Sequence, residues 1–263
     1  LIMKTKISFV IAAIALIVLA SCKKDKNDPP ANNNPELLGP ETSKVFHYSF
    51  NGNLKDGSGN GLNGADSFNI TYTADRFGRT NQAAVFGGAS NPSWILTPAL
   101  GPKITGFPMA ISFWFKPVNV NSGQTIIKSD GFERSATSGF IVAFGYRPGQ
   151  MGFTFGDKTT GGSTGTNYVV TPQNVLTNNT WQHIVVNVRG ANDYDFYING
   201  TKINNCTYGG FATSMVFYPP PVRGMIGNTD DYPSYYEGAL DDYRIYTKVL
   251  SQQEVSALYN FVP

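Results

Sequence analysis

The sequence predicts an all-β fold, a sandwich of two sheets with one short helix at its C-terminal end. Turn residues and β-forming aromatic residues are both abundant, with 28 Gly, 16 Pro, 14 Tyr and 18 Phe among 263 residues. Short apolar or alternating segments, separated by turn residues, follow one another from about residue 44, and no long helical pattern interrupts them. A chain of this length can form one large β domain, and many short strands favour a sandwich.

The first 21 residues have the pattern of a signal peptide and not of a folded element. Lys4 and Lys6 precede an apolar run of about fourteen residues, Ile7–Ala20, whereas a membrane-spanning helix needs roughly twenty. The run ends in Leu19-Ala20-Ser21-Cys22, which resembles a bacterial lipobox. The resemblance implies that Cys22 becomes the lipidated first residue of the mature protein. Ordinary cleavage near Ala20 is the alternative.

Residues 22–43 are predicted to form a flexible tether, because they are rich in Lys, Asp, Asn and Pro and contain almost nothing to bury. The charged tract Lys23–Asp28 resembles the surface-export tracts of Bacteroidetes lipoproteins, although it mixes both signs of charge. We therefore expect a bacterial outer-membrane lipoprotein with its folded domain at 44–263. The anchor at Cys22 would hold it on the cell surface or on the periplasmic face.

Strands are predicted wherever apolar residues alternate or run together between turn residues. They are Val45–Phe50, Ala83–Phe86, Ser93–Leu96, Ala110–Lys116, Gln124–Ile127, Gly139–Phe144, Met151–Phe155, Trp181–Val188, Asp193–Ile198 and Gly238–Tyr246. Asn199-Gly200 predicts a two-residue hairpin, because both residue types tolerate the positive φ of a type I′ turn. Ser251-x-x-Glu254 is a capping box that begins the terminal helix.

Five motifs, in this order, resemble the laminin-G-like jelly rolls of the concanavalin A-like lectin/glucanase superfamily. They are F-x-G-N-x-x-D-x-S-G-N-G at 50–61, D-R-F-G with A-x-x-F-x-G at 75–88, S-F-W-F-K-P at 112–117, W-x-H with Y-I-N-G at 181–200, and G-A-L-D-D-x-R-I-Y with L-S-x-x-E at 238–254. Together they span essentially the whole domain. The resemblance implies that the sandwich is an antiparallel jelly roll.

The resemblance also implies a structural Ca²⁺ between the opening turn and the closing strand, where Asp56 and Asp241 match the family. Asn51, Asn53 and Asp56 lie in a Gly-rich turn and offer the hard oxygen ligands that Ca²⁺ accepts. Because neighbouring strand residues point to opposite faces, only one of Asp241 and Asp242 is expected to enter a given site. The alternative is that Asp56 caps its own turn and Asp242 forms a surface pair with Arg244.

Aromatic side chains flanked by amides and carboxylates indicate a carbohydrate-binding surface. The candidates are Trp94 beside Asn91, Tyr146 with Arg147 and Gln150, and the loop Asp230-Asp231-Tyr232-Pro233-Ser234-Tyr235-Tyr236. The loop is the strongest candidate, because two Asp and three Tyr within seven residues are hard to bury. Packing against the core is the alternative for each aromatic residue.

Catalysis is not expected. Glucanases of the superfamily place acidic residues two apart on one strand, as E-x-D-x-E, for acid and nucleophile roles, and this motif is absent from the sequence. His183 is predicted to satisfy a hydrogen bond in the core, and the sequence identifies no partner for His47. Two His residues this far apart do not suggest a metal-hydrolase cluster.

The sequence therefore predicts a lipid-anchored, non-catalytic extracytoplasmic module that binds glycans. The formal net charge is +2, and the absence of a long Lys/Arg cluster beyond the N-terminus argues against a nucleic-acid partner. One alternative is an adhesion or assembly module that binds an extracellular protein. The other is a divergent glycoside hydrolase or lyase, which would need two carboxylates about 5–9.5 Å apart in a cleft.

Overall fold

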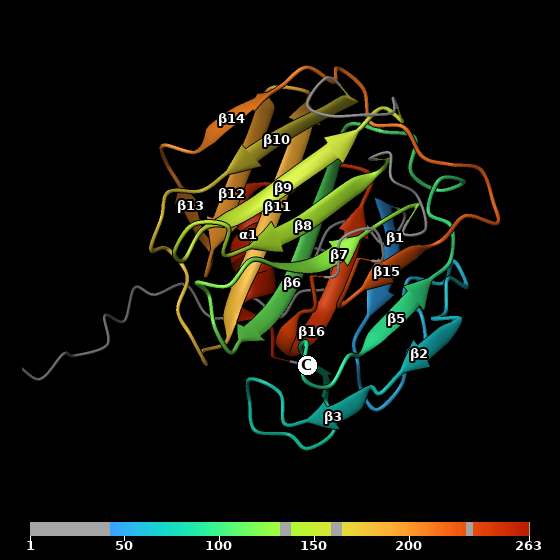
Figure 1. The fold of residues 1–263 in the computed structure, drawn as a ribbon, viewed down its shortest axis with the longest axis vertical. Helices are drawn as coiled ribbons and strands as arrows, with labels where there is room; N and C mark the ends of the chain where they lie inside the picture. The colour runs from blue at the N-terminus through green and yellow to red at the C-terminus, as the bar shows by residue number, and fades with distance from the viewer. Residues whose placement is uncertain (1–42, 132–137, 159–164, 230–233, 263) are drawn as a thin grey trace, which may run out of the picture. The chain divides into compact units, whose positions relative to one another are not determined.

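The computed structural model describes residues 43–131, 138–158, 165–229 and 234–262, which form two eight-stranded sheets and one short helix (Figure 1). The elements are β1 (Lys44–Tyr48), β2 (Asp66–Phe68), β3 (Thr71–Thr73), β4 (Ala83–Gly87), β5 (Trp94–Thr97), β6 (Met109–Pro117), β7 (Gln124–Lys128), β8 (Phe140–Phe144), β9 (Met151–Gly156), β10 (Thr166–Val170), β11 (Gln182–Gly190), β12 (Asp193–Ile198), β13 (Thr201–Ile203), β14 (Thr207–Gly210), β15 (Gly224–Ile226), β16 (Glu237–Tyr246) and α1 (Gln252–Asn260). The predicted all-β sandwich of antiparallel sheets is confirmed.

One sheet, sheet A, has the strand order β13-β12-β11-β6-β16-β4-β3, and β1 also pairs with β16. β4 pairs with the first part of β16 at Glu237–Leu240, whereas β1 pairs with its last part at Tyr243–Tyr246. Asp241 and Asp242 lie between these two pairings. The edge of β16 is therefore open at the two adjacent carboxylates.

The other sheet, sheet B, has the strand order β14-β10-β9-β8-β7-β15-β5-β2, and it lies in front in Figure 1. The core lies between the sheets and is rich in phenylalanine. On β6, Ile111, Phe113 and Phe115 enter this core, while Ala110 and Trp114 point to the outer face of sheet A. This is the alternation expected of a half-buried strand.

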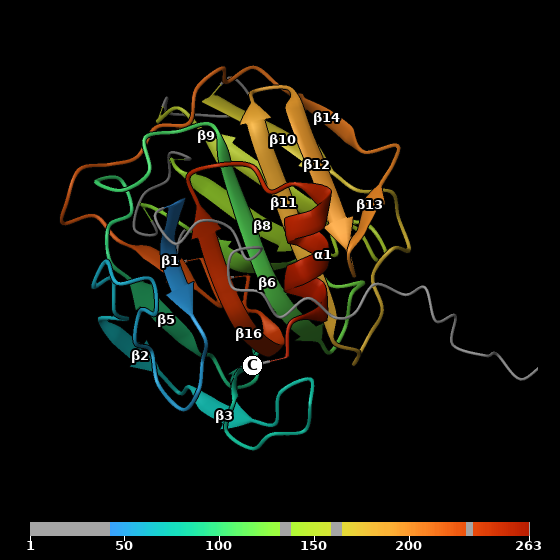
Figure 2. The same ribbon diagram turned by 180° about the vertical axis from the view of Figure 1, so that it is seen from behind.

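Helix α1 covers part of the outer face of sheet A, as Figure 2 shows. Val255 and Leu258 on the helix pack with Val185, Tyr197 and other outward residues of the sheet. The predicted capping box is confirmed: the Ser251 side chain accepts from the Glu254 amide, and the Glu254 carboxylate accepts from the Ser251 amide. The helix thus begins where the sequence placed its start.

All ten predicted strands are present, and the Asn199-Gly200 hairpin has positive φ at both residues. Strand β13 is the second arm of that hairpin. The structure adds five more short strands that the pattern did not predict: β2, β3, β10, β14 and β15. Each has only three to five residues, and β2 is exposed throughout, so its pairing depends on neighbours distant in sequence. Within the described part of the chain, no helix is long and apolar enough to cross a membrane.

Candidate functional site

A network of buried charged side chains lies on the outer face of sheet A, where three distant segments meet. Arg76 donates from Nη1 to Asp241 Oδ2 over 2.7 Å and from Nη2 to Asp242 Oδ2 over 3.1 Å. Asp242 Oδ1 also bonds with His47 Nε2 at 3.1 Å and accepts from Arg244 Nη2 at 2.8 Å. Both oxygens of Asp242 are therefore engaged by cationic or imidazole groups.

A β-bulge in β16 brings both carboxylates to the same side. Asp242 has a φ of 52°, and the pairing with β6 shifts register between Asp241 and Arg244. Leu240 and Tyr243 both reach the core, so one extra residue has been inserted into the alternation. The expectation that only one of the two carboxylates can enter a given site is wrong, because the bulge overrides the two-residue period. The Asp242–Arg244 pair does form, but it is buried and not a surface pair.

The turn that supplies Arg76 is fixed by its own first residue. Asp75 accepts hydrogen bonds from the amides of Phe77 and Arg79 through Oδ1, and from Arg79 Nε through Oδ2. This carboxylate-capped turn directs Arg76 inward onto β16, where its side chain is only 5% exposed. Phe77 is left outside, 43% exposed.

Burial and neighbouring charges shift the pKa values of the three titrating groups, lowering two of them and raising the third. Burial alone would raise the pKa of Asp242, but the charge of Arg244 and the hydrogen bond from His47 hold that pKa well below its usual range. Burial, together with the charge of Asp242, raises the pKa of Asp241. Burial and the charge of Arg244 lower the pKa of His47, although Asp242 opposes this. The neighbours of Asp242 thus favour its ionised form, whereas the surroundings of Asp241 favour its protonated form.

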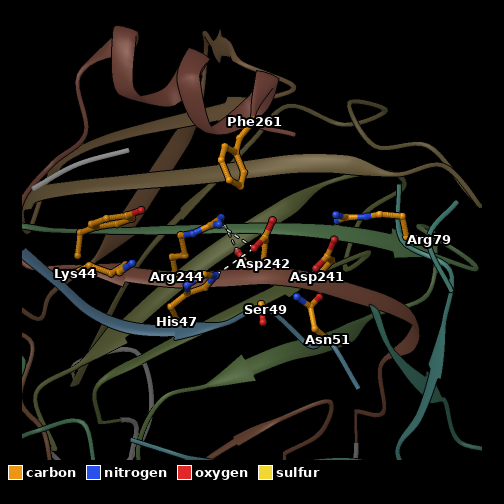
Figure 3. Close-up of a pocket in the computed structure, with 10 residues that line it drawn as sticks. Lys44, His47, Ser49, Asn51, Arg79, Asp241, Asp242, Arg244 and Phe261 are labelled. Atoms are coloured by element: carbon orange, nitrogen blue, oxygen red, sulfur yellow. Dashed lines mark hydrogen bonds and ion pairs between the residues drawn. The ribbon is translucent and has the colours of Figure 1, made fainter. Parts of the chain in front are cut away.

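A cavity of about 290 Å³ opens beside this network, and Figure 3 shows the side chains around it. It is lined by Lys44, His47, Ser49, Asn51, Arg79, Asp241, Asp242, Arg244, Tyr246 and Phe261. Three cationic side chains face two carboxylates here, so the lining is mixed in charge and not an acidic cage.

The four predicted calcium ligands do not converge on one cage. Asp56 accepts four hydrogen bonds within its own region, from the amides of His47, Ser58 and Leu62 and from the Ser58 hydroxyl. Asn53 is likewise engaged with the amide of Lys55 and the carbonyl of Asn51. Asn51 and Asp241 do share the cavity, but Asp241 is bound by Arg76. These residues do not fit a single Ca²⁺ site in this arrangement.

The predicted glycan-binding residues of the Asp230–Tyr236 loop differ in where they lie. Tyr236 is fully buried, packs against Phe86 and Phe144, and donates from its hydroxyl to the carbonyl of Ala239. Its assignment as a ligand-binding residue is wrong, because it belongs to the core. Tyr235 is half-buried. Asp230, Asp231 and Tyr232 lie outside the described residues.

Trp94 and Tyr146 lie at the same end of sheet B. The strands β8, β7, β15 and β5 are paired side by side in this order. Their registers place the end of β8, which precedes Tyr146, and the start of β5, which is Trp94, at the same end of the sheet. Tyr146 is 69% exposed, and half-buried Trp94 stacks on Phe68 at 4.5 Å. The Ser234 hydroxyl donates a hydrogen bond to the Gly123 carbonyl at this end, and Gly123 lies next to the Tyr146 ring. We call this region the rim.

A second cavity of about 370 Å³, the aromatic cleft, contains residues that the sequence did not identify as a site. It is lined by Arg76, Phe77, Trp114, Trp181, Tyr259 and Asn260. Trp114 pairs with His183 on β11 and with Asp241 on β16, so these three share the outer face of sheet A. Alternation along β6 could have placed Trp114 outward. The positions of the Asp75–Arg79 turn and of α1 could not be read from the sequence.

The described residues contain no group of three or more His, Cys, Asp or Glu side chains arranged to hold a metal ion. His183 is buried and its Nε2 forms a hydrogen bond with the Ser112 hydroxyl at 2.9 Å. The predicted buried hydrogen bond is present, but it lies on the outer face of sheet A and not between the sheets. His47 has a partner that the sequence did not reveal, Asp242.

Comparison with known proteins agrees with this architecture. A laminin-G-type family model, described as the concanavalin A-like lectin/glucanases superfamily, matches residues 90–256. Domain 4 of an extracellular GH43 arabinanase from Geobacillus stearothermophilus, solved in complex with arabinotriose, has 19% identity and a TM-score of 0.55, covering 82% of this chain and 98% of that one. The binding domain of Paraclostridial Mosquitocidal Protein 1 has 17% identity and a TM-score of 0.61, covering 83% and 52%.

Among curated proteins, adhesion G-protein coupled receptor V1 of Danio rerio is 23% identical over 181 residues. The match covers 69% of this chain but 3% of the receptor's length. At these identities, the solved structures establish the fold and nothing more.

Proposed function

The chain belongs to the laminin-G-like family of the concanavalin A-like lectin/glucanase superfamily, and on this premise we propose that it is a lipid-anchored, non-catalytic binding module for glycans. The observation that carries the proposal is the setting of its solvent-facing aromatic side chains. Two places are alternatives for the ligand. At the rim, Trp94 and Phe68 lie beside Asn69 and Asn91. In the aromatic cleft, Phe77 and Tyr259 lie beside Arg76 and Asn260. Binding pockets for small polar ligands combine aromatic walls with a few polar groups in this way.

Two similar structures support a binding role. The arabinanase domain was solved with arabinotriose, and the mosquitocidal protein's match is its binding domain. A sugar-binding role for this chain agrees with the first and is compatible with the second. The fold alone cannot choose the ligand, because function depends on the site.

The buried charge network argues against a divergent glycoside hydrolase. Such an enzyme needs one carboxyl that gives up a proton and a second that attacks the sugar or activates water. Both oxygens of Asp242 are already bound by His47, Arg244 and Arg76. Asp241 shares the same guanidinium. The pair is therefore better suited to holding the bulge together than to catalysis.

Protein binding is a second candidate, favoured by one observation. Edge strand β14 carries Tyr208, which is 59% exposed, and the next residue after the strand, Phe211, is 71% exposed. Exposed aromatic residues beside an unpaired strand edge can dock another polypeptide. The relationship to an adhesion receptor agrees with this candidate.

A glycan array followed by titration calorimetry on the purified protein tests the proposed function. We expect saturable binding to at least one class of oligosaccharide. No binding to any glycan, together with a specific protein partner that is lost in Tyr208→Ser, would replace the glycan proposal with the adhesion one.

The lipid anchor and its membrane are tested separately. We propose that Cys22 is acylated, so that the domain is tethered to the outer membrane through residues 22–43. Cys22→Ser should move the protein from the membrane fraction to the soluble fraction and abolish incorporation of a labelled fatty acid. Unchanged fractionation would contradict the anchor, and protease accessibility on intact cells separates the surface from the periplasmic face.

A further inference from the structure

We propose that the aromatic cleft binds a single ring of a neutral sugar chain. This inference rests on the proposed glycan-binding function and names the place where the ring is held. The location differs from the one that the sequence predicted, because the sequence candidates Trp94 and Tyr146 lie at the rim. Three properties of the cleft carry it: fixed aromatic walls, an exposed amide, and a size and charge that match one uncharged ring.

The walls of the cleft are held in place by the charge network. The guanidinium of Arg76 lies 4.5 Å from the centre of the Trp114 ring and 4.6 Å from that of Phe77. Its Nη atoms are fixed by Asp241 and Asp242. Tyr259 stacks on Trp114 at 5.6 Å with an interplanar angle of 15°. A ligand would therefore meet a preformed surface, which reduces the entropy cost of binding.

The cleft offers both kinds of contact that a sugar ring uses. Phe77 and Tyr259 are 43% and 37% exposed, so their faces can pack against the apolar C–H face of a ring. For hydrogen bonds, the exposed amide of Asn260 lines the cleft. Its Nδ2 donates to the Ser256 carbonyl at 2.8 Å, which leaves Oδ1 to accept from a sugar hydroxyl.

Size and charge define the occupant further. A volume of about 370 Å³ is at the lower end of small-molecule pockets, which span about 300–1,000 Å³. A docked helix, about 10–12 Å across, needs a longer groove. Among the described residues that line the cleft, Arg76 alone is charged, and its Nη atoms are already paired with Asp241 and Asp242. Because this guanidinium already has its carboxylate partners, we expect a neutral ring and not an acidic sugar.

Two phenylalanines of similar exposure provide a matched test. Phe77 in the cleft is 43% exposed, and Phe68 at the rim is 46% exposed. Calorimetry with cellohexaose, xylohexaose and arabinohexaose would compare the wild type with Phe77→Ala and Phe68→Ala. Loss of an aromatic anchor should weaken binding about tenfold in Phe77→Ala, while Phe68→Ala should bind like the wild type. Equal melting temperatures of the two variants exclude a folding defect.

Tryptophan fluorescence gives a readout independent of affinity. Two of the three tryptophans, Trp114 and Trp181, line the cleft, and the third is Trp94 at the rim. A bound sugar should still change the emission of Trp94→Phe, and it should change that of Trp181→Phe much less. The cleft proposal is overturned if Phe77→Ala has no effect on binding. It is also overturned if Phe68→Ala weakens binding and Trp94→Phe loses the fluorescence change. In either case the glycan function itself still stands. A wild type that binds no glycan overturns both proposals.

Discussion

Arg76 and Asp241 are 165 residues apart in sequence, yet Arg76 Nη1 lies 2.7 Å from Asp241 Oδ2. The same guanidinium donates to Asp242 and to the carbonyl of Phe261, 3.2 Å away. One side chain thus joins the turn after β3, the bulge of β16 and the residues that follow α1. It also engages Asp241, which the sequence suggested as a calcium ligand, and its neighbour Asp242.

Replacing Arg76 should therefore destabilise the fold strongly. Arg76→Met leaves Asp241 and Asp242 buried with one cation fewer. Breaking a buried ion pair from one side typically costs about 3–5 kcal/mol, because the remaining charge is uncompensated. Urea denaturation should show a loss of this order in the free energy of unfolding.

Arg223→Met is the matched control for this change. Arg223 pairs with Asp66 at 3.2 Å, but the two side chains are 34% and 70% exposed. An exposed pair contributes about 0–1 kcal/mol, so this variant should unfold almost like the wild type. If both variants lose a similar free energy of unfolding, the buried network stabilises the fold no more than an exposed ion pair does.

His183 should make the protein less stable in mild acid. Burial, followed by the charges of Arg244 and Arg76, lowers the pKa of His183 to about 3, whereas an unfolded His has a pKa of about 6.5. The unfolded state then binds more protons in this window, so the free energy of unfolding falls as pH drops below about 6.5. The slope approaches about 1.4 kcal/mol per pH unit.

A His183→Gln variant separates this effect from the other titrations. Glutamine can still contact Ser112 but does not titrate. The raised pKa of Asp241 acts in the opposite sense, since its folded form binds a proton more tightly than the unfolded form. The difference between the pH–stability profiles of the two proteins above about pH 4.5 therefore reports His183. Parallel profiles would contradict the assignment of His183 as a neutral buried residue.

Chelation should leave the domain unchanged. The predicted calcium ligands do not converge, and Arg76 already donates a hydrogen bond to Asp241. We expect the same melting temperature in excess EDTA and in millimolar CaCl₂. A rise of several degrees on adding Ca²⁺ that disappears in Asp241→Asn would instead support a metal held near Asn51 and Asp241, which share a cavity.

Removal of the helix cap should have a moderate effect. Ser251→Ala removes the acceptor for the Glu254 amide, and loss of an N-cap costs about 0.5–2 kcal/mol. Ser256→Ala, inside the same helix, is the control, because Ala is the better helix former there. If the two variants unfold alike, the capping box does not stabilise the packing of α1 on sheet A.

Patterns between near neighbours account for much of the fold. Alternation predicted ten of the strands, the positive φ tolerated by Asn199 and Gly200 predicted the hairpin, and Ser251 with Glu254 marked the helix start. These features depend on residues close together in the chain. The short strand β2 does not, since its three exposed residues become a strand only by pairing with β5.

The composition and motifs of the sequence determined an all-β sandwich of the laminin-G-like family, because strand period, turn chemistry and helix capping are local. Tertiary structure alone decided the sites. The bulge at Asp242 turned two carboxylates to one face, Arg76 reached them from a distant turn, and Tyr236 went into the core. The physical reason is that a site is made by side chains whose proximity depends on the packing of whole sheets, and no local pattern encodes that packing.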